Sequence, residues 1–236
     1  MPSCAVRPDS PISRDGMAAE GEARRLCDRI ERSVAQEFDG VRTARVAFSG
    51  GLGSLLIAAI ARKRTDLTCV VVGQRHSPDV RQAAALRNHL DFRLDIVTPA
   101  PAATLERIRA FAGEHTRWKS DQLIDAVSIL TALATGPGPW LTGHGSHPSS
   151  SATKTWIRTL HTATPLLAGR TPVATRRELI AAGRVLGIPD AFLLVPPRSP
   201  GSGSGIARGL RRQARQAGLS VRQLLMPVSP PSIPFR

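Results

Sequence analysis

One stretch decides the fold: Ala44-Arg45-Val46-Ala47-Phe48-Ser49-Gly50-Gly51-Leu52-Gly53-Ser54. A short apolar run ends at a Ser-Gly-Gly turn, and apolar residues from Leu55 to Ala61 continue at helical density. The stretch therefore predicts a buried strand, a glycine turn and a helix. Such a turn lets backbone N–H groups approach an anion closely, and the positive end of the helix adds to the same place. A phosphate group suits this arrangement, and a tight strand-to-helix turn without a ligand is the alternative.

Strands alternate with helices on both sides of this stretch. An amphipathic helix is expected over 17–38, because apolar residues recur there at helical spacing. Further strands are expected at 67–73, 92–97 and 140–142, with helices at 79–90, 103–112 and 121–134 between them. Such alternation predicts an α/β fold with a doubly wound parallel sheet, in which ligands bind at the carboxyl ends of the strands.

The chain divides into one domain with two tails. Residues 1–16 and the Pro-rich segment 227–236 are predicted to be unstructured, and 17–226 form the domain. Its first part, 17–150, carries the α/β pattern, and 151–226 is mainly helical. The pattern Thr175-Arg176-Arg177-Glu178 is a capping box that predicts a helix start.

The charge of the chain favours an anionic partner. There are 32 Lys plus Arg residues against 18 Asp plus Glu, a formal net charge of +14, and nearly all the cations are arginine. Arginine suits bidentate contacts with phosphate. Nucleic acid is therefore a candidate partner, and a solvated basic surface is the alternative. The same two interpretations apply to a predicted helix face that carries Arg208, Arg211, Arg212 and Arg215.

Cysteine usage and hydropathy exclude other classes of protein. Cys4, Cys27 and Cys69 are isolated, so neither a zinc ribbon, nor an iron–sulfur cluster, nor a disulfide framework is expected. No apolar run reaches the ~18 residues of a membrane span, and the start of the chain lacks the apolar core of a signal peptide. A cytoplasmic protein is the expectation.

Three segments together resemble one family. Val46 to Ser54 resembles the Ser-Gly-Gly-x-Asp-Ser loop of the asparagine-synthetase-like ATP pyrophosphatases, the PP-loop family. Leu141-Thr142-Gly143-His144-Gly145 looks like that group's Leu-x-Gly-x-Gly-Ala-Asp-Glu segment, and 177–206 is similar to its C-terminal run. The resemblance covers about residues 20–225, with order and spacing in agreement.

The resemblance implies an adenine nucleotide alpha hydrolase-like fold of the HUP type, and ATP as the ligand. In the family a magnesium ion bridges the phosphates, a carboxylate substrate is adenylated, and ammonia or an amine then attacks, which makes the enzyme an AMP-forming amide ligase. Arg198 stands near a family lysine that is catalytic, where it would stabilise negative charge. The implied nucleotide-binding residues are Ser49, Gly50, Gly51, Leu52, Gly53, Ser54, Gly73, Gly143 and Gly145.

The chain departs from the family at both metal carboxylates. Gly53 stands in place of the loop aspartate, and His147-Pro148 stands where Asp-Glu is expected, so no metal ligand is predicted. Magnesium requires hard oxygen ligands, which neither residue supplies. Asp79, Asp121 and Asp125 are substitute candidates, although each is more simply a helix-start or surface carboxylate. His144 and His147 are too few ligands for zinc.

Three functions follow from these observations. The first is an asparagine-synthetase-like domain that activates a small carboxylate, with nitrogen taken free or from a separate ammonia-supplying partner. The second is a non-catalytic nucleotide-binding or scaffold protein, favoured by the lost carboxylates. The third is a tRNA-modifying PP-loop enzyme, favoured by the basic charge.

Overall fold

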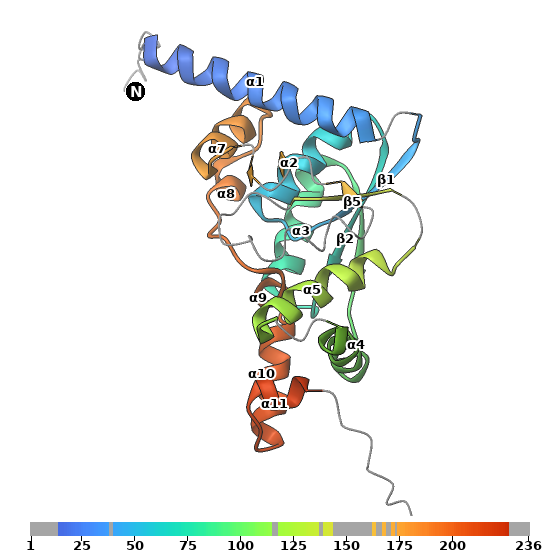
Figure 1. Ribbon diagram of the computed structural model, residues 1–236. Helices are drawn as coiled ribbons and strands as arrows, with labels where there is room; N and C mark the ends of the chain where they lie inside the picture. Colours follow the sequence, from blue (N-terminus) through green and yellow to red (C-terminus); the bar gives the residue numbers. More distant parts are fainter. Residues whose placement is uncertain are drawn as a thin grey trace, which may run out of the picture.

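The computed structural model describes residues 14–37, 40–114, 118–136, 139–143, 162–163, 167–168, 171–172 and 174–226. They contain a five-stranded sheet in the order β3-β2-β1-β4-β5, and every neighbouring pair is parallel. The strands are β1 (Thr43–Ala47), β2 (Asp66–Val72), β3 (Arg93–Val97), β4 (Trp140–Thr142) and β5 (Thr162–Ala163). The predicted α/β class with a doubly wound parallel sheet is confirmed (Figure 1). A short antiparallel pair, β6 (Leu167–Ala168) and β7 (Thr171–Pro172), lies outside this sheet.

The helices follow the predicted pattern. Helix α1 begins at Arg14, three residues before the predicted start and inside the segment expected to be unstructured, while 1–13 and 227–236 lie outside the described residues. No helix in the described part of the chain is long and apolar enough to cross a bilayer. The helices are α1 (Arg14–Glu37), α2 (Leu52–Ala61), α3 (Pro78–Leu90), α4 (Pro101–Glu114), α5 (Ser120–Leu133), α7 (Arg176–Val185), α8 (Asp190–Leu193), α9 (Pro200–Gly203), α10 (Ile206–Gln216) and α11 (Val221–Leu225).

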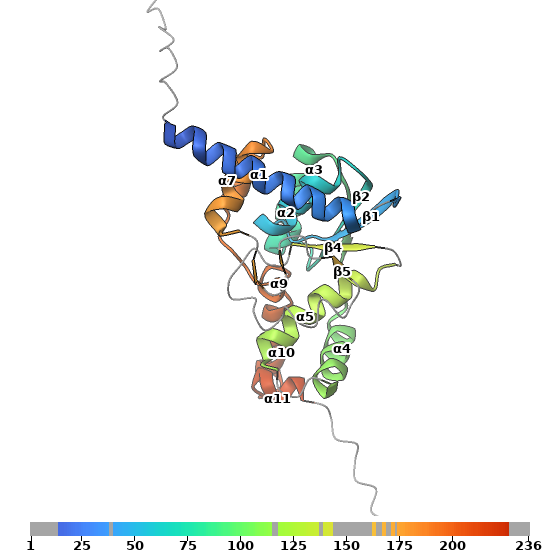
Figure 2. The same ribbon diagram turned by 45° about the horizontal axis from the view of Figure 1, so that its top comes forward.

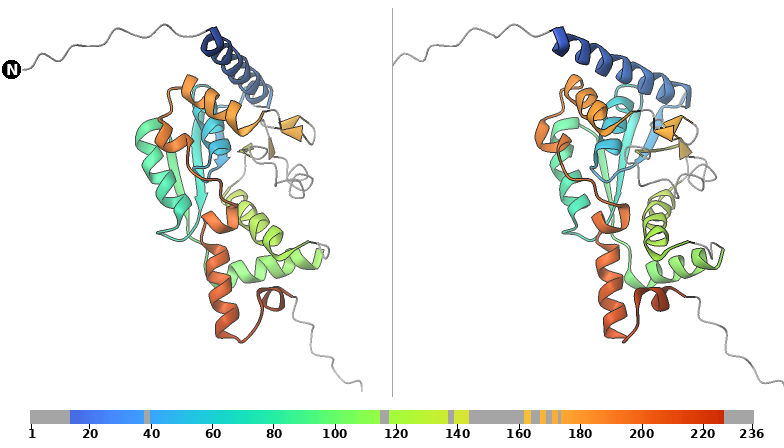
Figure 3. Two further views of the ribbon diagram at one scale, coloured as in Figure 1. Left: turned by 90° about the vertical axis from the view of Figure 1, so that its left-hand side faces the viewer. Right: turned by 60° about the vertical axis from the view of Figure 1, so that its left-hand side comes forward.

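Strand β2 divides the core into two layers because its side chains alternate between the faces of the sheet. Cys69 and Val71 pack into the layer formed with α1, α2, α3, α7 and α8. Val70 and Val72 pack into the layer formed with α4, α5, α10 and α11. Both faces of the sheet are therefore covered by helices, as a parallel sheet requires (Figures 1 and 3).

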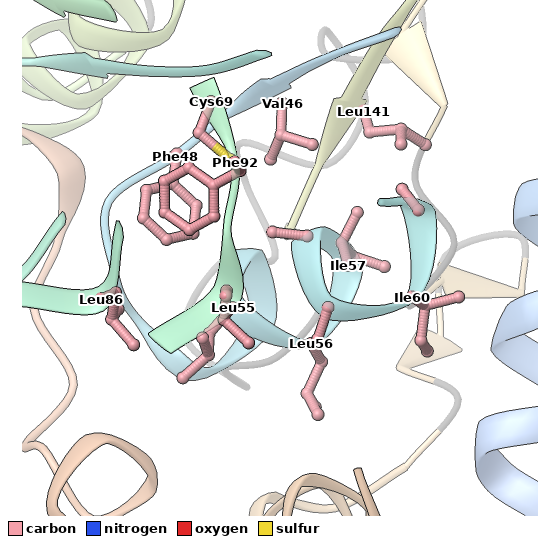
Figure 4. Packing of buried hydrophobic residues seen from close by; sticks show 14 of the residues in the cluster. Val46, Phe48, Leu55, Leu56, Ile57, Ile60, Cys69, Leu86, Phe92 and Leu141 are labelled. Carbon is pink, nitrogen blue, oxygen red and sulfur yellow. The ribbon is translucent and has the colours of Figure 1, made fainter. Parts of the chain in front are cut away.

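Helix α2 is buried along its whole length, from Leu52 to Ala61. It packs on β1 and β4 and is covered by α1 and α7. Figure 4 shows Ile57 on the side of α2 that faces Val46 and Leu141, whereas Leu56 points to the opposite side of the helix. A helix that is apolar on all sides can only be stable in such a position, so the apolar run after the glycine turn fixes the centre of the core.

The C-terminal helices continue from the core layer beside α1 to the far end of the molecule, where α10 and α11 form a C-terminal extension. The capping box at α7 is present, because Thr175 accepts from the Glu178 N–H and the Glu178 carboxylate accepts from the Thr175 N–H. From there the chain runs through α8 and α9 to α10 and α11, which lie beside α4 at the end of the molecule opposite α1 (Figures 1 and 2).

Truncating Leu55 to alanine tests the importance of α2. Leu55 has no exposed surface, so the free energy of unfolding in urea should fall by ~2–5 kcal/mol through lost burial and a cavity. Leu219 is 41% exposed, and the matched Leu219→Ala change should cost less than ~0.5 kcal/mol. Equal losses for the two variants would contradict the central position of α2.

Candidate functional site

The Ser-Gly-Gly turn is shaped by one glycine and two serines. Gly50 has a φ of +69°, and a Cβ there would lie 2.5 Å from Cγ of Gln82, so glycine is required on both grounds. The Ser49 hydroxyl accepts from the Gly51 N–H at 3.3 Å, and the Ser54 hydroxyl donates to the Gly51 carbonyl at 3.0 Å. The serine side chains therefore hold the conformation of the loop itself.

The first turn of α2 is left without a side-chain cap. Gly51 is the N-cap residue and makes no capping bond, because it has no side chain. Among the described residues no acceptor is found for the N–H groups of Leu52 and Gly53, and both residues line a cavity. Uncapped N–H groups at the positive end of a helix form an anion-binding site when they face solvent.

Strand β4 ends directly against this turn. A Cβ on Gly143 would lie 2.0 Å from the Ser54 backbone nitrogen, so only glycine allows the two backbones to approach this closely. Thr142, just before it, is 3% exposed and lines the cavity, and its hydroxyl has no hydrogen-bond partner among the described residues. A buried hydroxyl without a partner indicates a place where a ligand or water completes the site.

The cavity has a volume of about 280 Å³ and lies where the order of the strands reverses, between β1 and β4. Ligands bind at this point in doubly wound sheets, since the crossovers diverge there. Its floor is formed by the ends of β1, β2 and β4, one wall by α5, and the other wall by the segment from Val195 to Pro200.

The predicted catalytic residue, Arg198, lies in this cavity beside a buried carboxylate. Its Nε is 3.8 Å from Oδ1 of Asp79, and the Arg198 side chain is 32% exposed while that of Asp79 is 7% exposed. Burial raises the pKa of Asp79 to about 7, and the Arg198 charge opposes that shift. The carboxylate also contacts α9, because a Cβ on Gly203 would lie 2.1 Å from Oδ1.

Asp125, on α5, is a second carboxylate at the cavity wall. Its Oδ1 accepts from the Gly201 N–H at 2.8 Å. Burial raises its pKa, and the hydrogen bonds from Gly201 and Ser199 oppose the shift. Asp79 and Asp125 therefore fix the position of α9, one from each side of the segment.

These two carboxylates do not make a fitting magnesium site. Asp79 contacts Arg198, and Asp125 is used by α9. Gly53 offers no side-chain ligand, and His147 lies outside the described residues. No group of three or more His, Cys, Asp or Glu side chains that could hold a metal ion occurs in the described part of the chain.

The structure brings most of the predicted site residues to one cavity. Two of the others do not line the cavity. Gly50 lies in the turn beside Gln82, and Gly73 packs against Ser77 and the Ser204 carbonyl. Gly145 lies outside the described residues. The predicted residues that line the cavity are Ser49, Gly51, Leu52, Gly53, Ser54, Gly143 and Arg198.

Arg176 is a cavity residue that the sequence did not identify. Its Nη2 donates to the Val195 carbonyl at 2.8 Å, which directs the guanidinium along the cavity wall. The capping box located the start of α7 but did not indicate that the first residue of the helix lines the cavity. Thr142 was also missed as a cavity residue, although it belongs to a predicted strand.

No known protein family matches the chain by sequence, and no curated protein does so. Similar solved structures are an NMN synthetase from Francisella tularensis (15% identity, 89% of this chain and 88% of that chain, TM-score 0.47) and an NH3-dependent NAD synthetase from Campylobacter jejuni (13%, 88% and 90%, 0.48). A third is a predicted subunit of tRNA methyltransferase from Methanocaldococcus jannaschii (18%, 79% and 93%, 0.41). Similarity at this level concerns the fold alone.

Asp79 should make stability depend on pH. The folded protein keeps the Asp79 proton up to a pKa of about 7, whereas the unfolded chain loses it near 3.8. The carboxyl therefore lowers the free energy of unfolding as pH rises between these values. Replacing Asp79 by asparagine should remove this effect, so stability relative to the unchanged protein should rise from pH 5 to pH 8. The rise should be at most ~3 kcal/mol, because only the two pH units between 5 and the pKa of about 7 contribute.

Urea unfolding at both pH values measures this difference. Asp95 is exposed on β3, and Asp95→Asn is the matched control, with a difference that should stay constant between the two pH values. A difference for Asp79→Asn that also stays constant would contradict the assigned protonation.

Proposed function

We propose that the cavity binds ATP, with its phosphates on the first turn of α2, and that the chain is an asparagine-synthetase-like member of the PP-loop ATP pyrophosphatases. One observation carries the proposal. The uncapped N–H groups of Leu52 and Gly53 and the unpartnered Thr142 hydroxyl line the same cavity at the strand-order reversal. Hydrogen-bond donors and a positive helix end in one place suit a phosphate group.

The charges around the cavity support the same assignment. Arg176 comes from α7 and Arg198 from the segment before α9, and both line the cavity with the phosphate loop. Guanidinium groups can hold phosphoryl oxygens by two parallel hydrogen bonds. Arg198 would then act as the catalytic cation, because it can stabilise charge on a leaving pyrophosphate.

The reaction proposed for this cavity is AMP-forming activation of a small carboxylate. A carboxylate oxygen attacks the α-phosphorus, the bond to the bridging oxygen breaks, and pyrophosphate leaves. Ammonia or an amine then attacks the acyl adenylate and releases AMP. The nitrogen comes free or from a separate partner, and the chain's own residues bind and orient ATP and stabilise the charge of the leaving group.

A non-catalytic nucleotide-binding protein is the second candidate. Gly53 supplies no carboxylate in the loop, and the described residues contain no group of three metal ligands. Loss of metal stabilisation can cost several kcal/mol of barrier height. Pyrophosphate release with a panel of amino acids and ammonia separates the two candidates: ATP binding without release supports the second.

Calorimetric titration of ATP, with and without magnesium, tests the binding proposal directly. Binding of ATP to the full chain, with inorganic pyrophosphate as a competitor, is the expected result. Absence of any nucleotide binding would overturn both candidates.

Gly51→Val separates binding from folding. The backbone at Gly51 has φ −72° and ψ 158°, which any residue adopts, and a Cβ there meets only the Ser49 hydroxyl, at 3.2 Å. The Ser49 hydroxyl would have to shift by a few tenths of an ångström, and the isopropyl group would then occupy the proposed phosphate position. ATP affinity should fall at least ~100-fold, equivalent to ~2.7 kcal/mol, with little change in Tm.

Gly113 provides the matched control, because nothing lies within 4 Å of a Cβ there. Gly113→Val should leave ATP affinity unchanged. Full ATP affinity in Gly51→Val would show that phosphates do not occupy the first turn of α2.

Gly53→Asp tests whether a metal position survives. The change restores a carboxylate at the loop position where the family pattern has one, and Gly53 lines the cavity. If the phosphates lie where we propose, magnesium should raise the ATP affinity of the variant ~10-fold or more, through a carboxylate–metal–phosphate contact. Calorimetry with ATP and magnesium measures this gain, and an unchanged affinity would contradict the phosphate position.

A further inference from the structure

The outer face of α10 carries four arginines, which we call the arginine face: Arg208, Arg211, Arg212 and Arg215. All four side chains belong to exposed residues. Their spacing of three and four residues places them on one side of the helix. At 1.5 Å per residue the row is about 10 Å long, with ~6 Å between residues four apart.

The opposite side of α10 is fixed in the core. Ile206, Ala207, Leu210 and Ala214 are buried with side chains of α4, α5 and α11. The packing sets the rotation of the helix, so the arginine face points outward. Figures 1 and 3 show α10 extending away from the sheet, at the end of the molecule where α11 and α4 also lie.

The arginine face has no carboxylate partner among the residues that the structure describes. Other exposed arginines do have one: Arg24 pairs with Glu20, and Arg184 pairs with Asp190. No ion pair in the described part of the chain includes any of the four residues of the arginine face. The sequence contains no Asp or Glu at all after Asp190, so any carboxylate near the arginine face would have to come from an earlier part of the chain.

We propose that the arginine face binds the phosphodiester backbone of a nucleic acid. Guanidinium groups match phosphate geometry bidentately, and a rigid row of them can contact successive phosphates. A bilayer fits less well, because a helix that inserts into a membrane needs a free apolar face, and that of α10 is buried. The proposal does not depend on nucleotide binding in the cavity.

Fluorescence anisotropy of the full chain with labelled 20-mer RNA and DNA, single-stranded and duplex, tests the proposal. Four phosphate contacts predict a slope of about −3.6 for log affinity against log salt on a duplex, or ~100-fold weaker binding at 200 mM than at 50 mM. Glutamine at all four positions of the arginine face should remove this salt dependence and weaken binding at 100 mM salt at least ~10-fold.

The matched control replaces four exposed arginines elsewhere, Arg25, Arg81, Arg87 and Arg177, by glutamine. This control variant has the same net charge as the variant of the arginine face, and it should bind the oligonucleotides nearly as tightly as the unchanged protein does. Equal loss of oligonucleotide binding in both variants would show that only net charge matters and would overturn the proposal. Unchanged binding in the variant of the arginine face would also overturn it, as would the absence of oligonucleotide binding by the unchanged protein.

Two further measurements complete the test. The double change Arg208→Gln with Arg212→Gln should halve the slope, and it keeps the proposal testable if the fourfold variant does not fold. Vesicles containing 30% phosphatidylserine serve as the membrane arm. The proposal would be overturned in favour of an anionic lipid surface if the glutamine changes weakened binding to vesicles but left oligonucleotide binding unchanged.

Discussion

The close approach between the end of β4 and the first turn of α2 is the constraint on which the site depends. Gly143 brings one backbone directly against another, at a distance that no side chain permits. Because β4 pairs with β1, and β1 leads into the loop, this contact sets the width of the crevice at the strand-order reversal. It also places Thr142 beside the uncapped N–H groups of α2. A bulkier residue at 143 would displace either the strand or the helix.

The two buried carboxylates connect the sheet domain to the C-terminal extension. Asp79 comes from α3 and Asp125 from α5, on opposite layers of the core, and both contact the α9 segment. Burying carboxylates costs free energy unless hydrogen bonds or charges compensate. Here the Gly201 N–H and Arg198 provide only part of that compensation, because burial still raises the pKa of both carboxyl groups. The same contacts hold Arg198 in the cavity and fix the start of α10. The positions of the cavity wall and of the arginine face therefore both depend on the contacts of Asp79 and Asp125 with the α9 segment.

The sequence predicted the elements well and their long-range contacts poorly. The apolar run of β2 and the glycine turn before α2 are local patterns: the first located its strand to within one residue, and the second located a helix that begins three residues before Leu55. The sequence favours an ordinary helix-start role for Asp79. It does not reveal the burial of this carboxyl, because the burial depends on α9, more than a hundred residues later. Gly73, a predicted nucleotide-binding residue, is not among the residues that line the cavity, and a Cβ there would lie 3.0 Å from the Ser204 carbonyl oxygen, a contact that the sequence does not reveal. The capping pattern that contains Arg176 predicts only where α7 begins, so it does not indicate that the Arg176 side chain lines the cavity.

Asp79 and a bound anion would influence each other through Arg198. In the structure the arginine lies beside a carboxyl whose pKa is about 7, so near neutral pH part of its charge is already balanced. A phosphate held by Arg198 would bring further negative charge close to Asp79, and like charges favour the protonated carboxyl. Once the Asp79 carboxyl takes up a proton, the Arg198 guanidinium would no longer balance a negative charge there and could contact the phosphate instead. Because Gly53 supplies no carboxylate to the loop, the freed charge of Arg198 would provide compensation for a phosphate bound there.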